Sequence, residues 1–185
     1  TRLSKLEKGE VAATMLAVAG LKRLGIFPPP PLRGRIEVGG APWEILSAGV
    51  PSSLTLPLKG GGDIYYLPLA LNEFIPAVAQ GAIGIECRKE DADIMRLLAP
   101  LSHAETESAV FCERAFLKIL DGSCKTPIAG YASIENGQLH FRGLIAKPDG
   151  SAHHSIAASG KASEAEKIGE EAGRALLAKA GRGFI

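Results

Sequence analysis

The strongest constraint on the fold lies in residues 128–158, where three runs of strand-forming residues are separated by two tight-turn dipeptides. Asn136-Gly137 strongly favours a two-residue hairpin, because both central positions of that turn need a positive φ. Asp149-Gly150 supplies a second turn signal of the same kind. The sequence therefore predicts a three-stranded antiparallel sheet, with strands at residues 128–135, 139–146 and 153–158.

Two predicted helices flank this sheet in the sequence. Ser102 and Glu105 have the spacing of a capping box, and an apolar stripe at helical spacing follows them. Glu113 lies on that stripe, so it must find hydrogen-bond partners if it is buried. Ser163 and Glu166 form a second capping-box pattern. The helix that follows is expected to place Ala165, Ile168, Gly169, Ala172 and Leu176 inward, giving an α+β domain whose two helices cover one face of the sheet.

The first part of the chain has a different character. Residues 3–9 are typical of a helix, and residues 91–101 predict another, with Asp91 as its N-cap. The apolar runs at 11–19 and 82–87 have the length of buried strands. Residues 27–62 contain proline and glycine clusters without lasting periodicity, which predicts a surface insertion. This part is therefore expected to be an incomplete α/β domain, because one or two strands do not make a stable sheet.

Composition excludes several classes of protein. The formal net charge is +1, so bulk charge favours neither nucleic acid nor an anionic membrane as a partner. No apolar run is long enough to cross a bilayer, and the first residues do not resemble a signal peptide. No group of His, Cys or carboxylate residues has metal-ligand spacing, so no metal is expected. The three cysteines form no close pair, which favours free thiols and a cytoplasmic location.

Cys124 is the cysteine with the most distinctive setting. It lies in a predicted loop between a helix and a strand, and Lys125 follows it. A neighbouring positive charge favours the thiolate, which can act as a nucleophile or as a permanent attachment point. Lone cysteines are more often inert small hydrophobes, so the position alone does not assign a role. Cys87 and Cys112, in a predicted strand and a predicted helix, are interpreted as packing residues.

Arg2, Arg23, Gln80 and Gly81 are further candidates. The two arginines stand at the ends of predicted elements, from which guanidinium groups can reach a cleft and bind carboxylates bidentately. Most arginines in such places only solvate the surface. Gln80 and Gly81 lie in a loop before a predicted buried strand, and such loops commonly line clefts.

Three strings of the sequence, taken together, resemble a known family. Residues 1–6 and 16–25 are similar to the second domain of hydroxymethylbilane synthases (porphobilinogen deaminases). Residues 76–86 resemble the hinge of those enzymes and the strand that returns to their first domain. Residues 113–116 and 122–128 resemble their cofactor-loop signature. The order of these matches identifies the chain as the C-terminal portion of a member of this family.

The resemblance implies a transferase of tetrapyrrole (haem and porphyrin) biosynthesis. The family condenses four porphobilinogens head to tail and releases ammonia at each step. Its primer is a dipyrromethane cofactor in thioether linkage to a loop cysteine, which matches Cys124. Arg2 and Arg23 match arginines that bind the acetate and propionate groups, and Gln80 and Gly81 match a segment that lines the cleft. The family's catalytic aspartate lies in the first domain, outside this sequence, so the chain alone is expected to be inactive and to hold no catalytic residue.

The resemblance also implies a domain plan. Residues 1–80 correspond to part of a periplasmic-binding-protein-like α/β domain with an insertion at 27–62. Residues 81–101 correspond to a strand and helix that return to the first domain, and residues 102–185 to the cofactor-carrying α+β domain. The expected partners are porphobilinogen and the growing pyrrole chain, and the expected state is a monomer that includes the N-terminal region. Ala79 and Ser123 stand where the family commonly has glycine.

Two alternatives of other classes remain. The first is a non-catalytic binding or interaction module, built on the C-terminal α+β domain, in which Cys124 is a free thiol. The second is a redox-sensing protein in which Cys124 responds to peroxide. Neither alternative accounts for three family motifs in the expected order.

Overall fold

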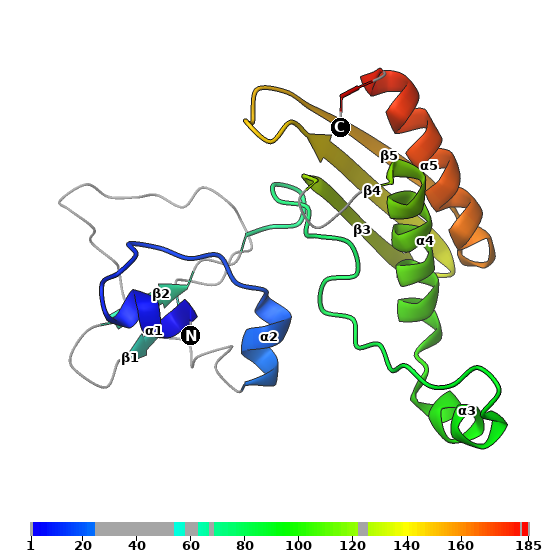
Figure 1. Cartoon of the computed structure of the whole chain (residues 1–185), viewed down its shortest axis with the longest axis horizontal. Helices are drawn as coiled ribbons and strands as arrows, with labels where there is room; N and C mark the ends of the chain where they lie inside the picture. Colours follow the sequence, from blue (N-terminus) through cyan, green and yellow to red (C-terminus); the bar gives the residue numbers. More distant parts are fainter. Residues whose placement is uncertain are drawn as a thin grey trace. The chain divides into compact units, whose positions relative to one another are not determined.

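In a computed structural model of the chain, the described residues are 2–24, 54–57, 63–66, 69–121, 126–181 and 183–184. The chain divides into two compact units, Thr1–Ala70 and Leu71–Ile185 (Figure 1). We call them the N-terminal unit and the C-terminal unit and describe each by itself.

The described residues of the N-terminal unit form two short helices and a two-stranded antiparallel sheet. The helices are α1 (Arg2–Glu7) and α2 (Val18–Arg23), and the strands are β1 (Leu54–Pro57) and β2 (Asp63–Tyr66). Leu54 pairs with Tyr66, and Pro57 pairs with Asp63. The helix predicted at residues 3–9 is confirmed by α1.

One prediction for the N-terminal unit is wrong. Residues 11–17 form no strand, and Val18 begins α2 instead. A strand of this kind exists only when neighbouring strands satisfy its amides, and the described residues of the unit give this segment no such partner. Val11 and Met15 are accordingly 39% and 57% exposed. Within the predicted insertion at 27–62, β1 is a strand that periodicity did not indicate, and the other residues of that range lie outside the described ones.

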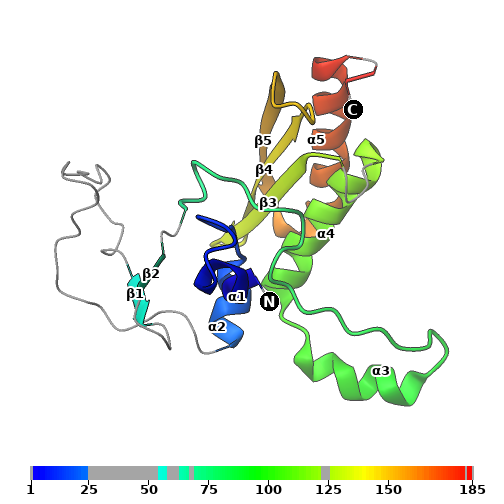
Figure 2. The same cartoon turned by 60° about the vertical axis from the view of Figure 1, so that its left-hand side comes forward.

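The C-terminal unit confirms the predicted α+β arrangement. A three-stranded antiparallel sheet, in the order β3-β4-β5, is covered on one face by two long helices (Figures 1 and 2). A short helix and a 3-10 turn precede them. The elements are α3 (Ala92–Leu98), η1 (Ala99–Leu101), α4 (Ala104–Leu120), β3 (Ile128–Glu135), β4 (Gln138–Ala146), β5 (His153–Lys161), η2 (Ala162–Glu164) and α5 (Ala165–Ala180).

The predicted hairpin between β3 and β4 has the expected turn. Asn136 and Gly137 both have positive φ, 52° and 77°, as this two-residue turn requires. Glu135 pairs with Gln138 directly across it. This register turns alternate residues of β4 toward the helices, so Leu139, Phe141, Gly143 and Ile145 are buried while their neighbours are not.

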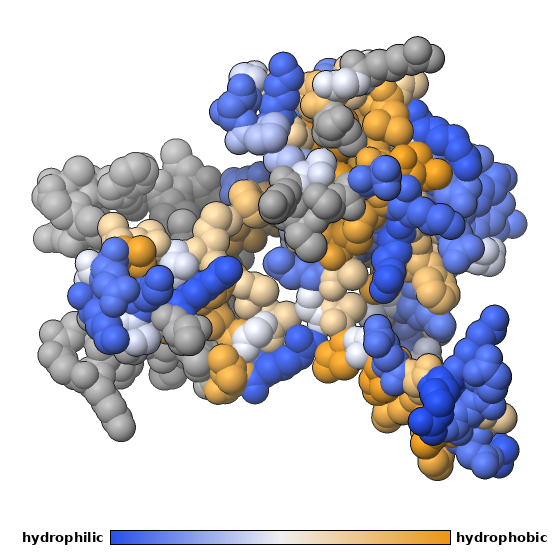
Figure 3. Space-filling model, viewed as in Figure 1, coloured by the Kyte–Doolittle hydropathy of each residue, from blue (hydrophilic) through white to orange (hydrophobic). Residues whose placement is uncertain are grey.

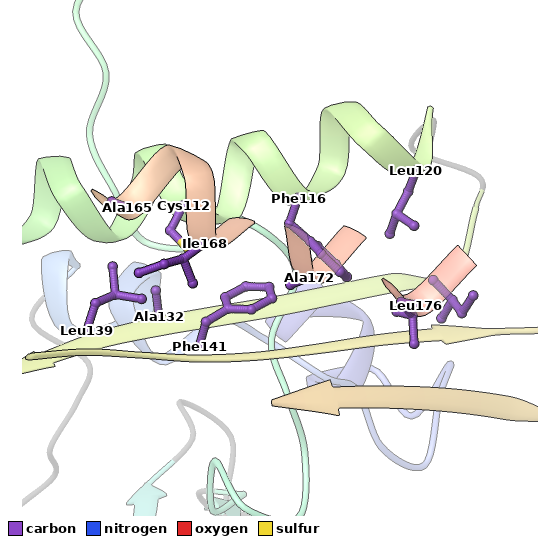
Figure 4. Close-up of a cluster of buried hydrophobic side chains, with 11 residues drawn as sticks. Cys112, Phe116, Leu120, Ala132, Leu139, Phe141, Ala165, Ile168, Ala172 and Leu176 are labelled. Carbon is purple, nitrogen blue, oxygen red and sulfur yellow. The ribbon is translucent and has the colours of Figure 1, made fainter. Parts of the chain in front are cut away.

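The core lies between the sheet and the two helices (Figure 4). Phe116 of α4 and Phe141 of β4 stack at a tilt, with ring centroids 4.8 Å apart. A Cβ on Gly143 would lie 2.5 Å from the Phe116 ring, so only glycine leaves room for that ring. The helices also approach closely, because a Cβ on Gly169 of α5 would overlap the carbonyl oxygen of Cys112. The buried apolar residues are Cys112, Phe116, Leu120, Ala132, Leu139, Phe141, Ile145, Ala165, Ile168, Ala172 and Leu176.

Groups from outside the sheet bond to both of its outer edges. At the β5 edge, the ammonium group of Lys179 donates to the carbonyl oxygen of Ser155 at 3.2 Å. At the β3 edge, the amides of Gly130 and Ala132 donate to groups outside the sheet, described below. Unpaired strand edges are sites of unwanted pairing, so these contacts protect the sheet.

The predicted helix starts are confirmed in one case and wrong in two. Asp91 caps α3, since its side chain accepts from the amide of Ile94. The N-cap of α4 is His103, whose Nδ1 accepts from the amide of Thr106, and Ser102 instead donates to Glu107. At the second predicted capping box, the chain forms the 3-10 turn η2, and α5 begins at Ala165 with no side-chain cap. The tighter turn already bonds amides that a capping side chain would serve.

The strand predicted at residues 82–87 is also wrong. These residues form no strand, and Ile83 and Ile85 are 75% and 56% exposed. Cys87 is exposed as well, which overturns its interpretation as a packing residue. Strand-like composition cannot produce a strand without neighbouring strands to pair with.

Candidate functional site

A segment that we call the strap, residues 71–81, runs along the β3 edge of the C-terminal unit. The amide of Gly130 in β3 donates to the carbonyl of Pro76 at 3.1 Å. Val78 lies 3.0 Å from the place where a Cβ on Gly130 would stand, so the glycine permits this close approach. The strap therefore contributes one hydrogen bond that a fourth strand would otherwise supply.

Glu113 of α4 completes the attachment. Its Oε1 accepts from the amide of Ala132 at 2.8 Å, and its Oε2 accepts from the amide of Ala79 at 2.6 Å. One carboxylate thus links α4, β3 and the strap. The sequence prediction that a buried Glu113 needs partners is confirmed.

The environment of Glu113 sets its protonation. The residue is only 6% exposed, and this burial raises the pKa of its carboxyl group. The hydrogen bonds from Ala79 and Ala132 stabilise the charged form and oppose part of that rise. A buried carboxylate held in this way is costly to leave unpaired, so the three elements that it joins are expected to stay joined.

Arg142 holds the other end of the strap. It lies on β4, on the sheet face away from the helices, because the alternate residues of β4 are the buried ones. Its Nη1 donates to the carbonyl of Leu71 at 3.0 Å and its Nη2 to the carbonyl of Asn72 at 3.2 Å. The strap is therefore fixed on both sides of the β3 edge.

Gln80 and Gly81 follow the Glu113 contact directly. The amide of Gln80 donates to the carbonyl of Ala77, and the amide of Ala82 donates to that of Ala79, so two tight turns enclose them. Ala79 and Gly81 have positive φ, 57° and 89°. Such a φ strains an alanine but not a glycine, so the Ala79 conformation depends on its surroundings. Gln80 is exposed, as a residue that lines a cleft must be.

Cys124 lies outside the described residues, and so its predicted role stays a prediction. The two ends of its loop are described. At one end, α4 finishes with buried Leu120 and with Asp121 in the left-handed conformation at φ 50°. At the other end, Thr126 accepts from the amide of Ile128 as β3 begins. The loop thus connects two elements that belong to the core.

The other two cysteines differ sharply from each other. Cys112 has no exposed surface, and burial, followed by the charge of Glu113, raises the pKa of its thiol to about 12. It is therefore an inert packing residue, as predicted. Cys87 is an exposed free thiol.

Arg2 and Arg23 both belong to the N-terminal unit and are exposed. Arg2 lies on α1 and donates through Nη1 to the carbonyl of Met15 at 3.4 Å, and Arg23 ends α2. Gln80 and Gly81 belong to the C-terminal unit. Among the described residues, no group of His, Cys, Asp or Glu is arranged to hold a metal ion.

Arg142 is the residue of this region that sequence analysis missed. It contacts residues 71 and 70 positions away in the chain, and no local pattern reports contacts at that distance. Its position on the solvent-facing side of a predicted strand was the one available signal, and that position alone does not distinguish it from a solvated surface arginine.

The fold and the site together define a two-unit chain in which a cysteine lies between a helix and a strand of an α+β domain. Residues 1–96 match the family model described as porphobilinogen deaminase, dipyromethane cofactor binding domain, and residues 108–178 match the porphobilinogen deaminase C-terminal domain. The chain belongs to the porphobilinogen deaminase family.

A comparison with a curated relative supports the same family. The chain is 43% identical, over 188 aligned residues, to a protein of Pisum sativum named porphobilinogen deaminase, chloroplastic. The alignment covers 100% of the chain and 42% of the relative, so the chain spans less than half the length of that protein. Arg2, Arg23, Gln80 and Gly81 lie within the first family match, and Cys124 lies within the second.

Proposed function

We propose that this chain supplies the cofactor-carrying part of a hydroxymethylbilane synthase, a transferase that joins four porphobilinogen units head to tail with loss of ammonia. One observation carries the proposal: Cys124 lies in the chain between α4 and β3, two elements of the C-terminal core, and within the residues that match the family's C-terminal domain. Membership of the family supports the same conclusion.

Cys124 is the proposed attachment point for a dipyrromethane cofactor, through a thioether. Its position in the sequence favours Cys124, and burial excludes Cys112. Cys112 is buried with its pKa raised to about 12, so it is neither accessible nor ionised near neutral pH. Cys87 is exposed and is the internal rival. When bound, the cofactor supplies the pyrrole carbon to which the first aminomethylpyrrole unit is joined.

The pyrrole substrates carry acetate and propionate groups, which need cationic partners. We propose that Arg2 and Arg23 bind these carboxylates, since both are exposed and a guanidinium group binds two carboxylate oxygens at once. Gln80 and Gly81 are proposed to line the same cleft. The amide side chain of Gln80 is exposed and carries both a donor and an acceptor.

The domain plan is likewise a proposal. Residues 1–80 are proposed to belong to a periplasmic-binding-protein-like α/β domain, and residues 102–185 to the cofactor-carrying domain. Residues 81–101 are proposed to belong with a further domain. Their exposed apolar side chains support this: Ile83, Leu97 and Leu101 are 75%, 72% and 68% exposed. Apolar surface is visible beside the charged surface in the region of α3 (Figure 3). We propose that turnover requires that further domain and that the complete enzyme acts as a monomer.

The cellular location of the protein is also a proposal. Within the described ranges, no helix is long and apolar enough to span a membrane. A cytoplasmic location stays a prediction, and the name of the pea relative assigns that protein to the chloroplast. Fractionation of cells that express the protein distinguishes the two compartments.

The test is the intact mass of the protein, carrying the further domain as an N-terminal extension, after purification from cells that make porphobilinogen. The wild-type chain is expected to carry an added mass equal to one dipyrromethane, retained in Cys87→Ser and lost in Cys124→Ser. Retention of the added mass in Cys124→Ser would overturn the attachment site. An unmodified wild-type chain that is stably folded would favour the rival function, a binding module with a free thiol, which the independent core of the C-terminal unit could support.

A further inference from the structure

The strap is attached to the C-terminal unit by three separate groups. Arg142 bonds the carbonyls of Leu71 and Asn72 at its start, Gly130 bonds Pro76 in its middle, and Glu113 bonds Ala79 near its end. These contacts come from β4, β3 and α4, which all contribute to one core. The division of the chain between residues 70 and 71 agrees with this attachment, because it places the whole strap in the C-terminal unit.

We propose that Arg142 is a positioning residue: together with Glu113 it fixes the strap to the C-terminal unit. Gln80 and Gly81 then move as one body with α4 and β3, the two elements between which Cys124 lies in the sequence. The chain then pivots before Leu71 and after Gly81, and the segment that resembles the family hinge is itself rigid.

The geometry gives each anchor a distinct task. Arg142 uses two nitrogens of one planar group to bond two successive carbonyls, so it fixes both the place and the direction of the chain at the start of the strap. Glu113 fixes the amide of Ala79, one residue before Gln80. Since Ala79 holds a φ of 57° that alanine disfavours, release of either anchor lets the turn relax and moves Gln80.

That Arg142 positions Gln80 and Gly81 for the reaction rests on the proposed function. That the strap is rigidly attached does not depend on that function. The first measurement is therefore hydrogen exchange of the purified 185-residue chain, followed by mass spectrometry. Wild type is compared with Arg142→Ala and Arg142→Lys. Arg174→Ala serves as the matched control, because Arg174 pairs only at the surface of α5 with Glu170 at 2.7 Å.

We expect the amides of Ala79, Gln80 and Ala82 to exchange about tenfold faster in Arg142→Ala, with β4 and α5 unchanged. Arg142→Lys is expected to restore part of the protection, because one ammonium group reaches one carbonyl. A change below about twofold in the strap, or an equal acceleration throughout the unit, would overturn the proposal. Glu113→Gln removes the other anchor, the carboxylate that bonds Ala79, and is expected to speed exchange of the same three amides.

The second measurement separates the positioning role from the proposed function. Each variant is prepared with the further domain as an N-terminal extension, and the rate at which it gains the dipyrromethane mass is followed with porphobilinogen present. Slower loading in Arg142→Ala than in Arg174→Ala supports positioning, and equal loading overturns it even if the strap is loosened. A wild-type chain that never loads contradicts the proposed function, and the exchange rates then still support or overturn the rigid strap.

Discussion

The carboxylate of Glu113 accepts a hydrogen bond from the amide of Ala132 at 2.8 Å, at the edge of β3 where a neighbouring strand would normally supply a carbonyl. A side chain from a helix therefore supplies the hydrogen-bond acceptor that the backbone of a neighbouring strand would supply. The same carboxylate bonds the amide of Ala79, so the stability of the edge and the position of the strap depend on one titratable group.

The first prediction concerns pH. Burial raises the pKa of Glu113 above its ordinary value of 4.5, so the folded state binds this proton more tightly than the unfolded state. The contribution of Glu113 to the free energy of unfolding is then greatest below pH 4.5 and is lost as pH rises through the folded pKa. Urea unfolding of wild type and of Glu113→Gln, at a series of pH values from below 4.5 upward, gives the free energy of unfolding of each protein. The difference between the two free energies measures the contribution of Glu113.

The control for that series is Glu170→Gln, which removes one negative charge from the exposed side of α5. The Glu113→Gln chain itself is expected to be less stable by about 1–3 kcal/mol, because the amide NH2 cannot accept from a backbone amide. A difference between wild type and Glu113→Gln that grows with rising pH would contradict the assigned burial effect.

The second prediction concerns the contact between the two long helices. Gly169→Ala places a methyl group against the carbonyl of Cys112, and the helices must separate to admit it. Overpacking of this kind costs about 1–3 kcal/mol, more than the gain in helix propensity returns. Thermal unfolding should show a lower midpoint than in Gly84→Ala, since no atom lies within 4 Å of a Cβ at Gly84. Equal midpoints would show that the helices are not in this close contact.

The third prediction concerns thiol reactivity. In a Cys124→Ser background, iodoacetamide at about pH 8 is expected to label Cys87 in the folded protein and Cys112 only after unfolding. Burial protects Cys112 in two ways, by excluding the reagent and by raising the thiol pKa to about 12. Peptide mapping of the labelled protein identifies the modified residue, and rapid native labelling of Cys112 would contradict the described core.

The fourth prediction concerns the hairpin turn. Gly137→Ala puts a side chain at φ 77°, a conformation that costs alanine about 1 kcal/mol. Asn136→Gly should be nearly neutral, because glycine accepts the φ of 52° at that position. Urea midpoints of the two variants test the contrast. A Gly137→Ala chain as stable as Asn136→Gly would mean that the turn has another geometry.

Local chemistry explains which features could be predicted from the sequence. Asn136-Gly137 specifies its turn through the φ preferences of two adjacent residues, and the register of β4 follows from that turn. The sequence also indicated that Glu113 needs partners, since a charge on an apolar stripe cannot remain unpaired. It did not indicate which partners, because Ala79 lies 34 positions away and contributes only its backbone amide.

The wrong strand predictions at residues 11–17 and 82–87 have a common physical origin. Their apolar composition suits a buried strand, but a strand forms only where neighbouring strands bond its amides. Composition cannot supply such neighbours, and both segments are irregular. The role of Arg142 could not be predicted for a different reason. Its partners are two backbone carbonyls, which any residue type presents, so the sequence does not mark them.

The two protected edges of the sheet also imply an order of events during synthesis. The groups that close the β3 edge, Pro76 and Glu113, leave the ribosome before that strand does, whereas Lys179, which closes the β5 edge, leaves it afterwards. A nascent chain therefore passes through an interval in which β5 has emerged and α5 has not. During that interval one side of the sheet is open to pairing with another chain, and the core still lacks Ile168, Ala172 and Leu176. Chaperone binding at this stage would protect the unit most, and the need for it ends when α5 docks.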